Sequence, residues 1–269
     1  MTRGFGVTAG LDPAVAEPLA GRCEMLGYAS MWSNDHPAAS GLETLATFAR
    51  SVPGIDLGVA VLALDRHSPE EIARRIEELG LPPERLWIGV GAGFSEKPLT
   101  TMRQALPELR EALPKVRLML AAMGPKMCGL AGSAYDGAFL NWMTPEFAAQ
   151  ARGHVHAGAR DAGRQPPPVL GYVRTAVGPD AEERLRTDEA FYRDLHDGYR
   201  NHFERLGAEP GSVGVASESP YVAQDELGRY EALDVVVVRA LASATVEAMT
   251  ALAEAAAPGG TEATEAKVR

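Results

Sequence analysis

Short runs of apolar and β-branched residues alternate along the chain with longer segments whose apolar positions recur at helical spacing. Runs of the first kind are typical of buried strands, and segments of the second kind are typical of amphipathic helices. Eight strand-like runs occur, at 4–10, 30–33, 56–64, 85–93, 117–124, 136–142, 169–177 and 234–240. The pattern therefore predicts strands that are separated from one another by helices.

Helices are expected at 13–26, 42–49, 69–79, 99–113, 125–134, 145–162 and 180–206. Several begin with proline after a polar residue or glycine, which is a favourable helix start. Strands separated by helices pair in parallel, and eight such units favour a closed (β/α)8 barrel over an open doubly wound sheet. We expect an α/β protein with one TIM-type barrel domain, residues 1–257, followed by a polar, disordered tail, 258–269.

Polar residues follow the second predicted strand, where Asn34, Asp35 and His36 precede Pro37. Asn, Asp and Pro are turn formers, so a plain surface turn is one interpretation. In a (β/α)8 barrel the carboxyl ends of the strands form the active site, and histidine ordinarily changes charge near neutral pH. The alternative is therefore a proton-transfer site in which Asn34 and Asp35 orient His36. The carboxyl ends of all the strands lie at one end of the barrel, called its mouth here. Residues that follow the other predicted strands are expected there as well, namely Asp65, Arg66, Gly91, Gly93, Glu96, Gly124, Lys126, Asn141, Trp142, Arg174 and Arg239.

Two glycine-containing segments invite a phosphate-binding interpretation. The run "GVGAGF" places Phe94 where a dinucleotide fingerprint needs its third glycine, and it does not follow the first strand, so we reject a Rossmann fold. The segment "MGPKM", 123–127, ends a strand and begins a helix, where free N–H groups and Lys126 favour an anion. An ordinary helix start with an exposed lysine is the competing interpretation.

Composition narrows the classes of function. The net charge of −10 argues against a general nucleic-acid or anionic-membrane binder, which needs a basic face. Cys23 and Cys128 lack ligand spacing and are expected to be reduced core thiols. The histidines form no ligand pair and no nucleophile motif occurs, so we expect no metal site. No signal peptide or long apolar run is found, which favours a cytoplasmic protein.

Several strand-end segments, taken in order, resemble one family. They are "LGYASMWSNDHP", "LGVAVLALDRHSPEEIARRIEEL", "RLWIGVGAG", "AAMGPKMCGLAGSAYDGAFLNWMTPE" and "DVVVVRAL". They resemble the bacterial luciferase-like superfamily, and most closely its branch of oxidoreductases that depend on coenzyme F420. The resemblance covers most of the chain, from Gly4 to about Ala253, and the ordered set is far more specific than any single motif.

The resemblance implies a barrel that binds a flavin or deazaflavin at its mouth and exchanges a hydride with it. It implies that His36 and Asn34 act beside the ring, with Glu96 as an acidic residue near the substrate. A non-prolyl cis peptide bond between Ala60 and Val61 is implied beneath the ring, where the ordinary expectation is a trans bond. The implied cofactor-binding residues are Ala60, Val61, Gly91, Gly93, Met123, Gly124, Pro125, Lys126, Met127, Asn141 and Arg174.

The sequence departs from the family pattern in two places. After the fourth strand it lacks a segment that relatives usually carry, which leaves the mouth more open or shaped by a partner, with Glu96 as the only nearby acidic match. Before the last strand, "GSVGVASESPYVAQDELGRYEAL" matches the usual helix poorly.

We therefore expect an oxidoreductase that uses coenzyme F420 and a small organic substrate. An FMNH2-dependent monooxygenase that uses FMN is the second hypothesis, although a short loop after strand four makes shielding from water harder. A degenerate barrel that binds a flavin, or nothing, without turnover and serves in assembly or regulation is the third. A homodimer is expected from family precedent and from four aromatic residues at helical spacing, namely Phe191, Tyr192, Tyr199 and Phe203.

Overall fold

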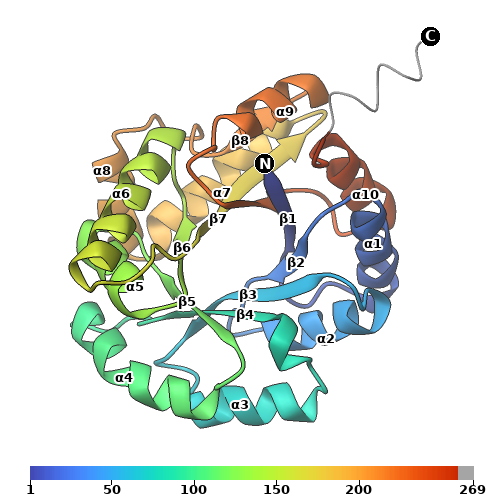
Figure 1. Ribbon diagram of the computed structural model, residues 1–269. Coiled ribbons are helices and arrows are strands. Elements are labelled where there is room, and N and C mark those ends of the chain that lie inside the picture. Colours follow the sequence, from blue (N-terminus) through green and yellow to red (C-terminus); the bar gives the residue numbers. More distant parts are fainter. Residues whose placement is uncertain (260–269) are drawn as a thin grey trace.

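The computed structural model describes residues 1–259 and shows a closed ring of parallel strands surrounded by helices (Figure 1). The strands are β1 (Thr2–Val7), β2 (Ser30–Ser33), β3 (Asp56–Ala63), β4 (Leu86–Gly91), β5 (Arg117–Ala121), β6 (Gly137–Asn141), β7 (Val169–Val177), β8 (Val215–Ser217) and β9 (Val235–Ala240). Strand β9 pairs with both β7 and β1, which closes the ring. The predicted (β/α)8 barrel is confirmed.

Helices follow the strands and cover the outside of the barrel (Figure 1). They are α1 (Pro13–Met25), α2 (Gly41–Ser51), α3 (Pro69–Glu78), α4 (Pro98–Ala112), α5 (Pro125–Ala134), α6 (Pro145–Asp161), α7 (Ala181–Leu195), α8 (Asp197–Leu206), α9 (Pro220–Gly228) and α10 (Val246–Ala255), with a short 3-10 helix at Pro83–Arg85. Side chains of Asp12, Ser40, Ser68 and Thr144 accept hydrogen bonds from the first turns of α1, α2, α3 and α6. These caps satisfy N–H groups that have no partner within the helix.

The core has two layers, because alternate residues of each strand point to opposite sides. One set, which includes Val7, Val59 and Leu120, packs outward against the helices. The other fills the barrel interior and includes Trp32, Ala60, Met119, Phe139, Leu170, Tyr172 and Val237. Gly58 makes room for the interior tryptophan, since a Cβ there would lie 2.3 Å from an atom of the Trp32 ring.

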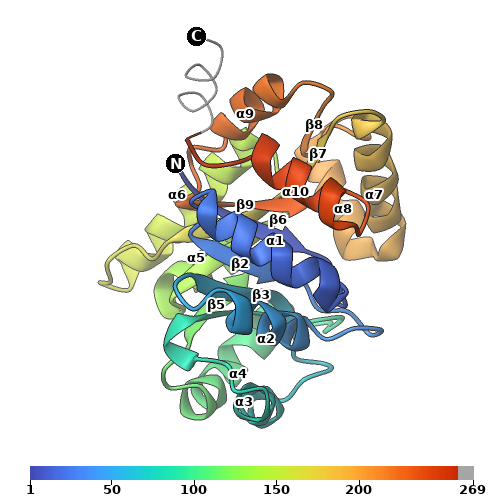
Figure 2. The same cartoon turned by 90° about the vertical axis from the view of Figure 1, so that its right-hand side faces the viewer.

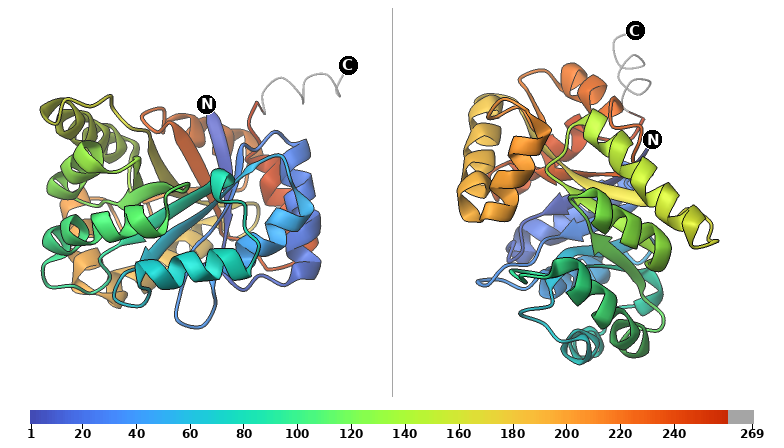
Figure 3. Two further views of the ribbon diagram at one scale, coloured as in Figure 1. Left: turned by 60° about the horizontal axis from the view of Figure 1, so that its bottom comes forward. Right: turned by 90° about the vertical axis from the view of Figure 1, so that its left-hand side faces the viewer.

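The segment 180–206 is two helices and not the one long helical segment that its pattern predicted. The backbone of His196 is extended, with φ −165° and ψ 147°, and this ends α7 and starts α8. The His196 Nδ1 atom accepts a hydrogen bond from the N–H of Gly198 at 2.9 Å, which caps the new helix. Both helices lie together beside the barrel (Figures 2 and 3).

The segment before the last strand, which matches the family's usual helix poorly, contains two elements that the pattern did not predict. It forms the short strand β8, which pairs with β7 at Thr175–Val177, and then α9. Strand β6 pairs with β7 only as far as Tyr172, and β9 occupies the opposite edge of β7. Strand β8 therefore extends the sheet at the carboxyl end of β7.

No helix among residues 1–259 is both long enough and apolar enough to cross a membrane. The expected polar tail, 258–269, lies outside the described residues from residue 260 onward.

Candidate active site at the carboxyl ends of the strands

The loop after β2 is held by its polar residues. The Asn34 side-chain oxygen accepts a hydrogen bond from the N–H of Ala9 at 2.9 Å, which ties the ends of β1 and β2 together. The Asp35 side chain is 3% exposed and lies 2.8 Å from Arg66 and 3.0 Å from His67. Both residues thus fix the loop to neighbouring strand ends.

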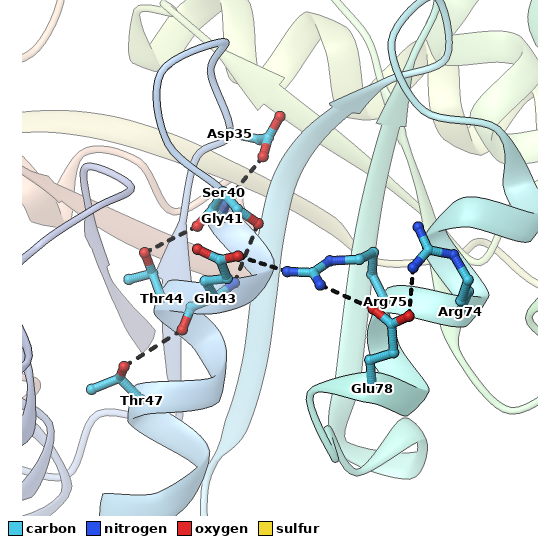
Figure 4. A network of polar contacts seen from close by, with 9 residues as sticks. All are labelled: Asp35, Ser40, Gly41, Glu43, Thr44, Thr47, Arg74, Arg75 and Glu78. Atoms are coloured by element: carbon cyan, nitrogen blue, oxygen red, sulfur yellow. Dashed lines mark hydrogen bonds and ion pairs between the residues drawn. The ribbon is translucent and has the colours of Figure 1, made fainter.

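Behind this loop a polar network joins α2 to α3 (Figure 4). Asp35 accepts a hydrogen bond from the N–H of Gly41 at 3.0 Å, which orients the start of α2. Farther along, Glu43 pairs with Arg75 at 2.6 Å, and Arg75 pairs with Glu78 at 3.0 Å. The helical ion pairs are partly exposed and contribute little stability. The network supports the position of the loop and does not reach into the barrel.

His36 lies in the tight turn that this network supports. Its main chain forms a bridge with Ala39, and its Nδ1 atom accepts a hydrogen bond from the N–H of Ala38 at 3.3 Å. The ring is half-buried, and its Nε2 atom has no hydrogen-bond partner among the described residues. The expectation that Asn34 and Asp35 orient the ring is wrong, because their side chains bind Ala9 and the Arg66–His67 pair instead.

Strand β3 has the expected irregularity. The peptide bond between Ala60 and Val61 is cis, and the pairing of β3 with β4 shifts between Ala60 and Leu62. Val61 is therefore left out of the register, and Gly91, which pairs with Ala63, lies close to it, since a Cβ at Gly91 would come 3.6 Å from Val61 Cγ2. The two glycines of β4, Gly89 and Gly91, lie beside this irregularity.

The turn after β4 depends on glycine. Gly93 has φ +57°, and a Cβ at this position would lie 2.0 Å from an oxygen of Asp65. The same carboxylate accepts a hydrogen bond from the N–H of Phe94 at 2.9 Å. Gly93 is thus required for the turn itself, whatever it binds. Glu96 follows on the exposed surface and makes no side-chain hydrogen bond within residues 1–259.

The short loop after β4 nevertheless reaches another part of the mouth. The Phe94 side chain is 67% exposed, and its ring centre lies 4.9 Å from that of His196 at the junction of α7 and α8. A contact of this kind joins the loop after β4 to the segment after β7. The abbreviation therefore does not leave the mouth fully open, because α7 and α8 meet the loop.

The start of α5 has the features of an anion site. Gly124 is the N-cap and supplies no capping side chain, so the first N–H groups of the helix are not bound by a cap. A Cβ at Gly124 would meet nothing within 4 Å, and Lys126 is exposed beside it. Arg205 from α8 donates a hydrogen bond to the carbonyl oxygen of Met123 at 3.2 Å. Helix N–H groups and two nearby cations favour a phosphate here.

Asn141 and Arg174 contact each other inside the mouth. Arg174 is 3% exposed and donates hydrogen bonds to the side-chain oxygen of Asn141 and to Asp188, the latter at 3.3 Å. Its guanidinium lies 3.9 Å above the Trp142 ring. Trp142 has φ +49°, an unusual conformation for a bulky residue, and this turns the chain sharply at the end of β6. Arg174 is thus held by protein groups.

The aromatic residues of α7 and α8 pack within the chain and do not form the exposed face expected for a dimer. Phe203 is 1% exposed, and Tyr192 and Tyr199 pack in the same cluster around Trp142. Of the four, Phe191 alone is largely exposed, at 60%. The pattern predicted one helical segment, but the break at His196 ends α7 and starts α8, and Tyr192, Tyr199 and Phe203 pack in one cluster with Trp142.

His202 and Tyr172 are two residues that the sequence reasoning did not select. His202 is buried, its Nε2 atom meets the carbonyl oxygen of Trp142, and its Nδ1 atom accepts from Arg205 at 3.3 Å. No local signal marks this histidine, because its partner lies 60 residues away. Tyr172 precedes Arg174 by two positions, so strand alternation alone places both on the inner face.

Residues 104–262 of the chain match the family described as luciferase-like monooxygenase. The chain belongs to this family. A curated relative of this luciferase-like chain is the 5,10-methylenetetrahydromethanopterin reductase of Methanolobus tindarius, which is 27% identical over 65% of this chain and 67% of the relative.

Solved structures share the luciferase-like fold. A coenzyme F420-dependent tetrahydromethanopterin reductase from Methanopyrus kandleri has a TM-score of 0.70, with 17% identity over 98% of this chain and 99% of that one. An F420-dependent secondary alcohol dehydrogenase in complex with an F420–acetone adduct has a TM-score of 0.71, with 16% identity over 95% of this chain and 98% of that one. An FMN-bound Baeyer–Villiger monooxygenase component of Pseudomonas putida has a TM-score of 0.63, with 13% identity over 96% of this chain and 99% of that one. At these identities the likeness shows the fold.

Proposed function

We propose that the protein is an oxidoreductase that transfers a hydride between coenzyme F420 and a small organic substrate at the mouth of the barrel. The observation that carries the proposal is the recurrence of one activity in two comparisons. The curated relative is a methylenetetrahydromethanopterin reductase, and a structure that matches 98% of the chain is an F420-dependent tetrahydromethanopterin reductase.

The residues at the start of α5 fit the phosphate of such a cofactor. The N–H groups of Lys126 and Met127 lie in the first turn, and Pro125 lacks an N–H. Lys126 and Arg205 add positive charge, while Gly124 leaves the backbone open to close approach. Met123 to Met127 would hold the phosphate.

The bulged backbone at Ala60 and Val61 fits the flat ring, with Gly91 and Gly93 beside it and Asn141 and Arg174 on the far wall. When bound, F420 supplies or accepts the hydride, and the protein supplies orientation and electrostatics. His36 would exchange a proton with the substrate through Nε2, which has no hydrogen-bond partner among residues 1–259. The amide nitrogen of Asn34 would donate to the substrate, and Glu96 would contact it from the rim.

An FMNH2-dependent monooxygenase is the second candidate. The contact between Phe94 and His196 favours it, because a loop that meets α7 and α8 helps to exclude water from the mouth. A barrel that binds flavin without turnover is the third candidate.

Titration of the purified apoprotein with F420 and, separately, with FMN tests the proposal through fluorescence changes of either cofactor. We expect F420 to bind at least tenfold more tightly than FMN, which is about 1.4 kcal/mol. Tighter binding of FMN would favour the monooxygenase. Binding of a flavin without turnover of any alcohol, ketone or reduced pterin would favour the third candidate.

The homodimer also remains a proposal. Phe191 is 60% exposed and Leu195 is 46% exposed, four residues apart on α7. Residues at this spacing share one helix face, so a second copy of the chain would bury both.

A further inference from the structure

Two buried polar atoms inside the barrel have no hydrogen-bond partner among the described residues. They are the hydroxyl oxygen of Tyr172 on β7 and the Nη1 atom of Arg239 on β9. The two side chains are 4% and 7% exposed. The strands are neighbours, and the Arg239 guanidinium lies 5.8 Å from the centre of the Tyr172 ring. Buried polar groups are almost always bonded, so this pair needs an explanation.

Arg3 shows how the fold satisfies another buried arginine. It is 6% exposed on β1, and its Nη1 atom donates to the carbonyl oxygens of Ala256 and Ala257 at 2.8 and 3.0 Å. Arg239 differs, because its one side-chain hydrogen bond within residues 1–259 runs from Nη2 to the hydroxyl of Thr8 at 2.8 Å. The Nη1 atom of Arg3 therefore has acceptors, although its Nε atom has none among the described residues, whereas the Nη1 atom of Arg239 has none.

The surroundings of Arg239 have an excess of positive charge. Arg174 on the adjacent strand is paired with Asp188, but Arg239 forms no ion pair within residues 1–259. Burial is the main cause that lowers the pKa of the Arg239 guanidinium. Burial also raises the pKa of Tyr172, so the tyrosine hydroxyl keeps its proton. A buried, unpaired cation is costly, and a bound anion would offset that cost. The cation and the O–H donor together suit an anionic oxygen.

The position of the pair indicates which molecule it faces. In the ring β1-β2-β3-β4-β5-β6-β7-β9, strand β7 lies opposite β3, and β9 lies opposite β4. The proposed ring site is on β3, and the proposed phosphate site follows β5. Tyr172 and Arg239 are therefore on the wall across from the cofactor, where a substrate would lie between the two walls.

We propose that Arg239 and Tyr172 bind a carboxylate of the substrate, so that the enzyme acts on a small organic acid. The proposal deepens the proposed function and rests on it, because that function places a substrate in the mouth. A guanidinium and a carboxylate form charge-assisted hydrogen bonds, and the tyrosine hydroxyl donates to the second oxygen. An anionic oxygen of the cofactor would offer the same chemistry, so the experiment must separate the two sources.

The test measures thermal unfolding of the full-length apoprotein in acetate and benzoate at constant ionic strength, with acetamide and benzamide as neutral probes. The variants are Arg239→Gln and Tyr172→Phe, with Arg3→Gln as a matched control of equal burial. We expect both carboxylates, and neither amide, to raise Tm in the wild type and in Arg3→Gln. Apparent carboxylate affinity should fall at least tenfold in Arg239→Gln and about threefold in Tyr172→Phe.

Stability provides a second readout. Tyr172→Phe removes a hydroxyl without a partner, and Arg239→Gln removes a buried unpaired charge together with one hydrogen bond to Thr8, so both should unfold at or above the wild-type Tm. Arg3→Gln removes hydrogen bonds to two carbonyl oxygens and should unfold below it. A Tm of Arg239→Gln as low as that of Arg3→Gln, or failure of Arg239→Gln to fold, would assign Arg239 a structural role and overturn the proposal. Equal increases of the wild-type Tm in the carboxylates and in the amides would also overturn the proposal.

Cofactor titration of the same variants identifies the source of the anion. We expect F420 affinity to stay within about threefold of wild type in Arg239→Gln. A tenfold loss of cofactor affinity, with no carboxylate effect, would assign the anion to the cofactor and overturn the proposal. If wild-type protein binds neither F420 nor FMN, the proposed function fails, whereas the carboxylate measurements still decide whether this pair binds an anion.

Discussion

At the residue scale, His36 differs from the other polar residues of its loop. Asn34 and Asp35 are bound to protein groups that hold strand ends together, whereas one ring nitrogen of His36 has no partner within the described chain. A side chain that contributes so few contacts to the fold is available for substrate. Histidine also accepts and releases protons readily near neutral pH.

His36→Ala should therefore reduce turnover by roughly 100-fold or more, the usual size of a lost acid or base. Cofactor affinity should stay within a few-fold, and Tm should hardly change, because the ring makes one weak contact. Steady-state kinetics, cofactor titration and thermal unfolding on one preparation measure all three. His154→Ala, at an exposed position of α6, is the control. Full activity in a stable His36→Ala protein would contradict a catalytic role.

His202 predicts a pH dependence of stability. Burial lowers the pKa of His202 below its ordinary value of 6.5. Above that value both the folded and the unfolded chain carry a neutral ring, so stability is unaffected. As pH falls below 6.5 the unfolded chain takes up a proton first, and the free energy of unfolding should decrease until the folded pKa is passed.

Urea denaturation between about pH 5 and 7.5 checks this prediction. His202→Gln should remove much of the slope, and His154→Gln should keep it, since His154 is exposed. A slope that survives in His202→Gln would assign the pH dependence to other groups.

At the element scale, the start of α5 combines a helix N-terminus with Lys126 and with Arg205 from α8. The electrostatic effect of a helix end falls off within its first turn, so the sign of one nearby charge matters. Two elements therefore determine this site, and α8 takes part only because the chain breaks at His196.

Lys126→Glu should lower cofactor affinity at least tenfold, about 1.4 kcal/mol, by placing a negative charge beside the donors. Fluorescence titration measures the cofactor affinity. Raising the salt concentration should reduce the difference in affinity between the wild type and Lys126→Glu. Lys115→Glu is the matched control, because Lys115 is exposed and precedes β5 at the other end of the barrel. Equal losses of cofactor affinity in the two variants would indicate an effect of net charge. An unchanged affinity in Lys126→Glu would indicate that the phosphate binds elsewhere.

At the scale of the whole molecule, the apolar surface of α7 suggests how two copies of the chain would meet. Phe191 and Leu195 are exposed on one helix face, whereas Tyr192 and Phe203 are used inside the protein. An isologous contact would bury Phe191 and Leu195 on both copies.

We expect the wild-type protein to have a dimeric mass in analytical ultracentrifugation at micromolar concentration, and Phe191→Asp to be monomeric. Tyr221→Asp, which changes another exposed aromatic residue on α9, should remain dimeric. A monomeric wild type would contradict the homodimer, and a dimeric Phe191→Asp would place the interface elsewhere.

The sequence by itself determined the barrel and the order of its strands. Strand and helix signals are local, because periodicity and helix starts such as Ser68-Pro69 are read within a few residues. The positions of His36, Gly91 and Lys126 at strand ends followed from the same reasoning. The expected cis bond between Ala60 and Val61 came from the family resemblance and is present in the structure.

Only the tertiary structure decided which of these groups are free. Asp35 is neutralised by Arg66, and Arg174 is paired with Asp188, through contacts that span 31 and 14 residues. No local pattern shows such pairing, since it depends on where strands and helices meet. For the same reason the sequence could not show that Phe203 on α8 is buried against Trp142 and Leu185. Nor could it show that Arg239 Nη1 and the Tyr172 hydroxyl have no hydrogen-bond partner among residues 1–259, because hydrogen bonding inside a barrel depends on the whole ring of strands.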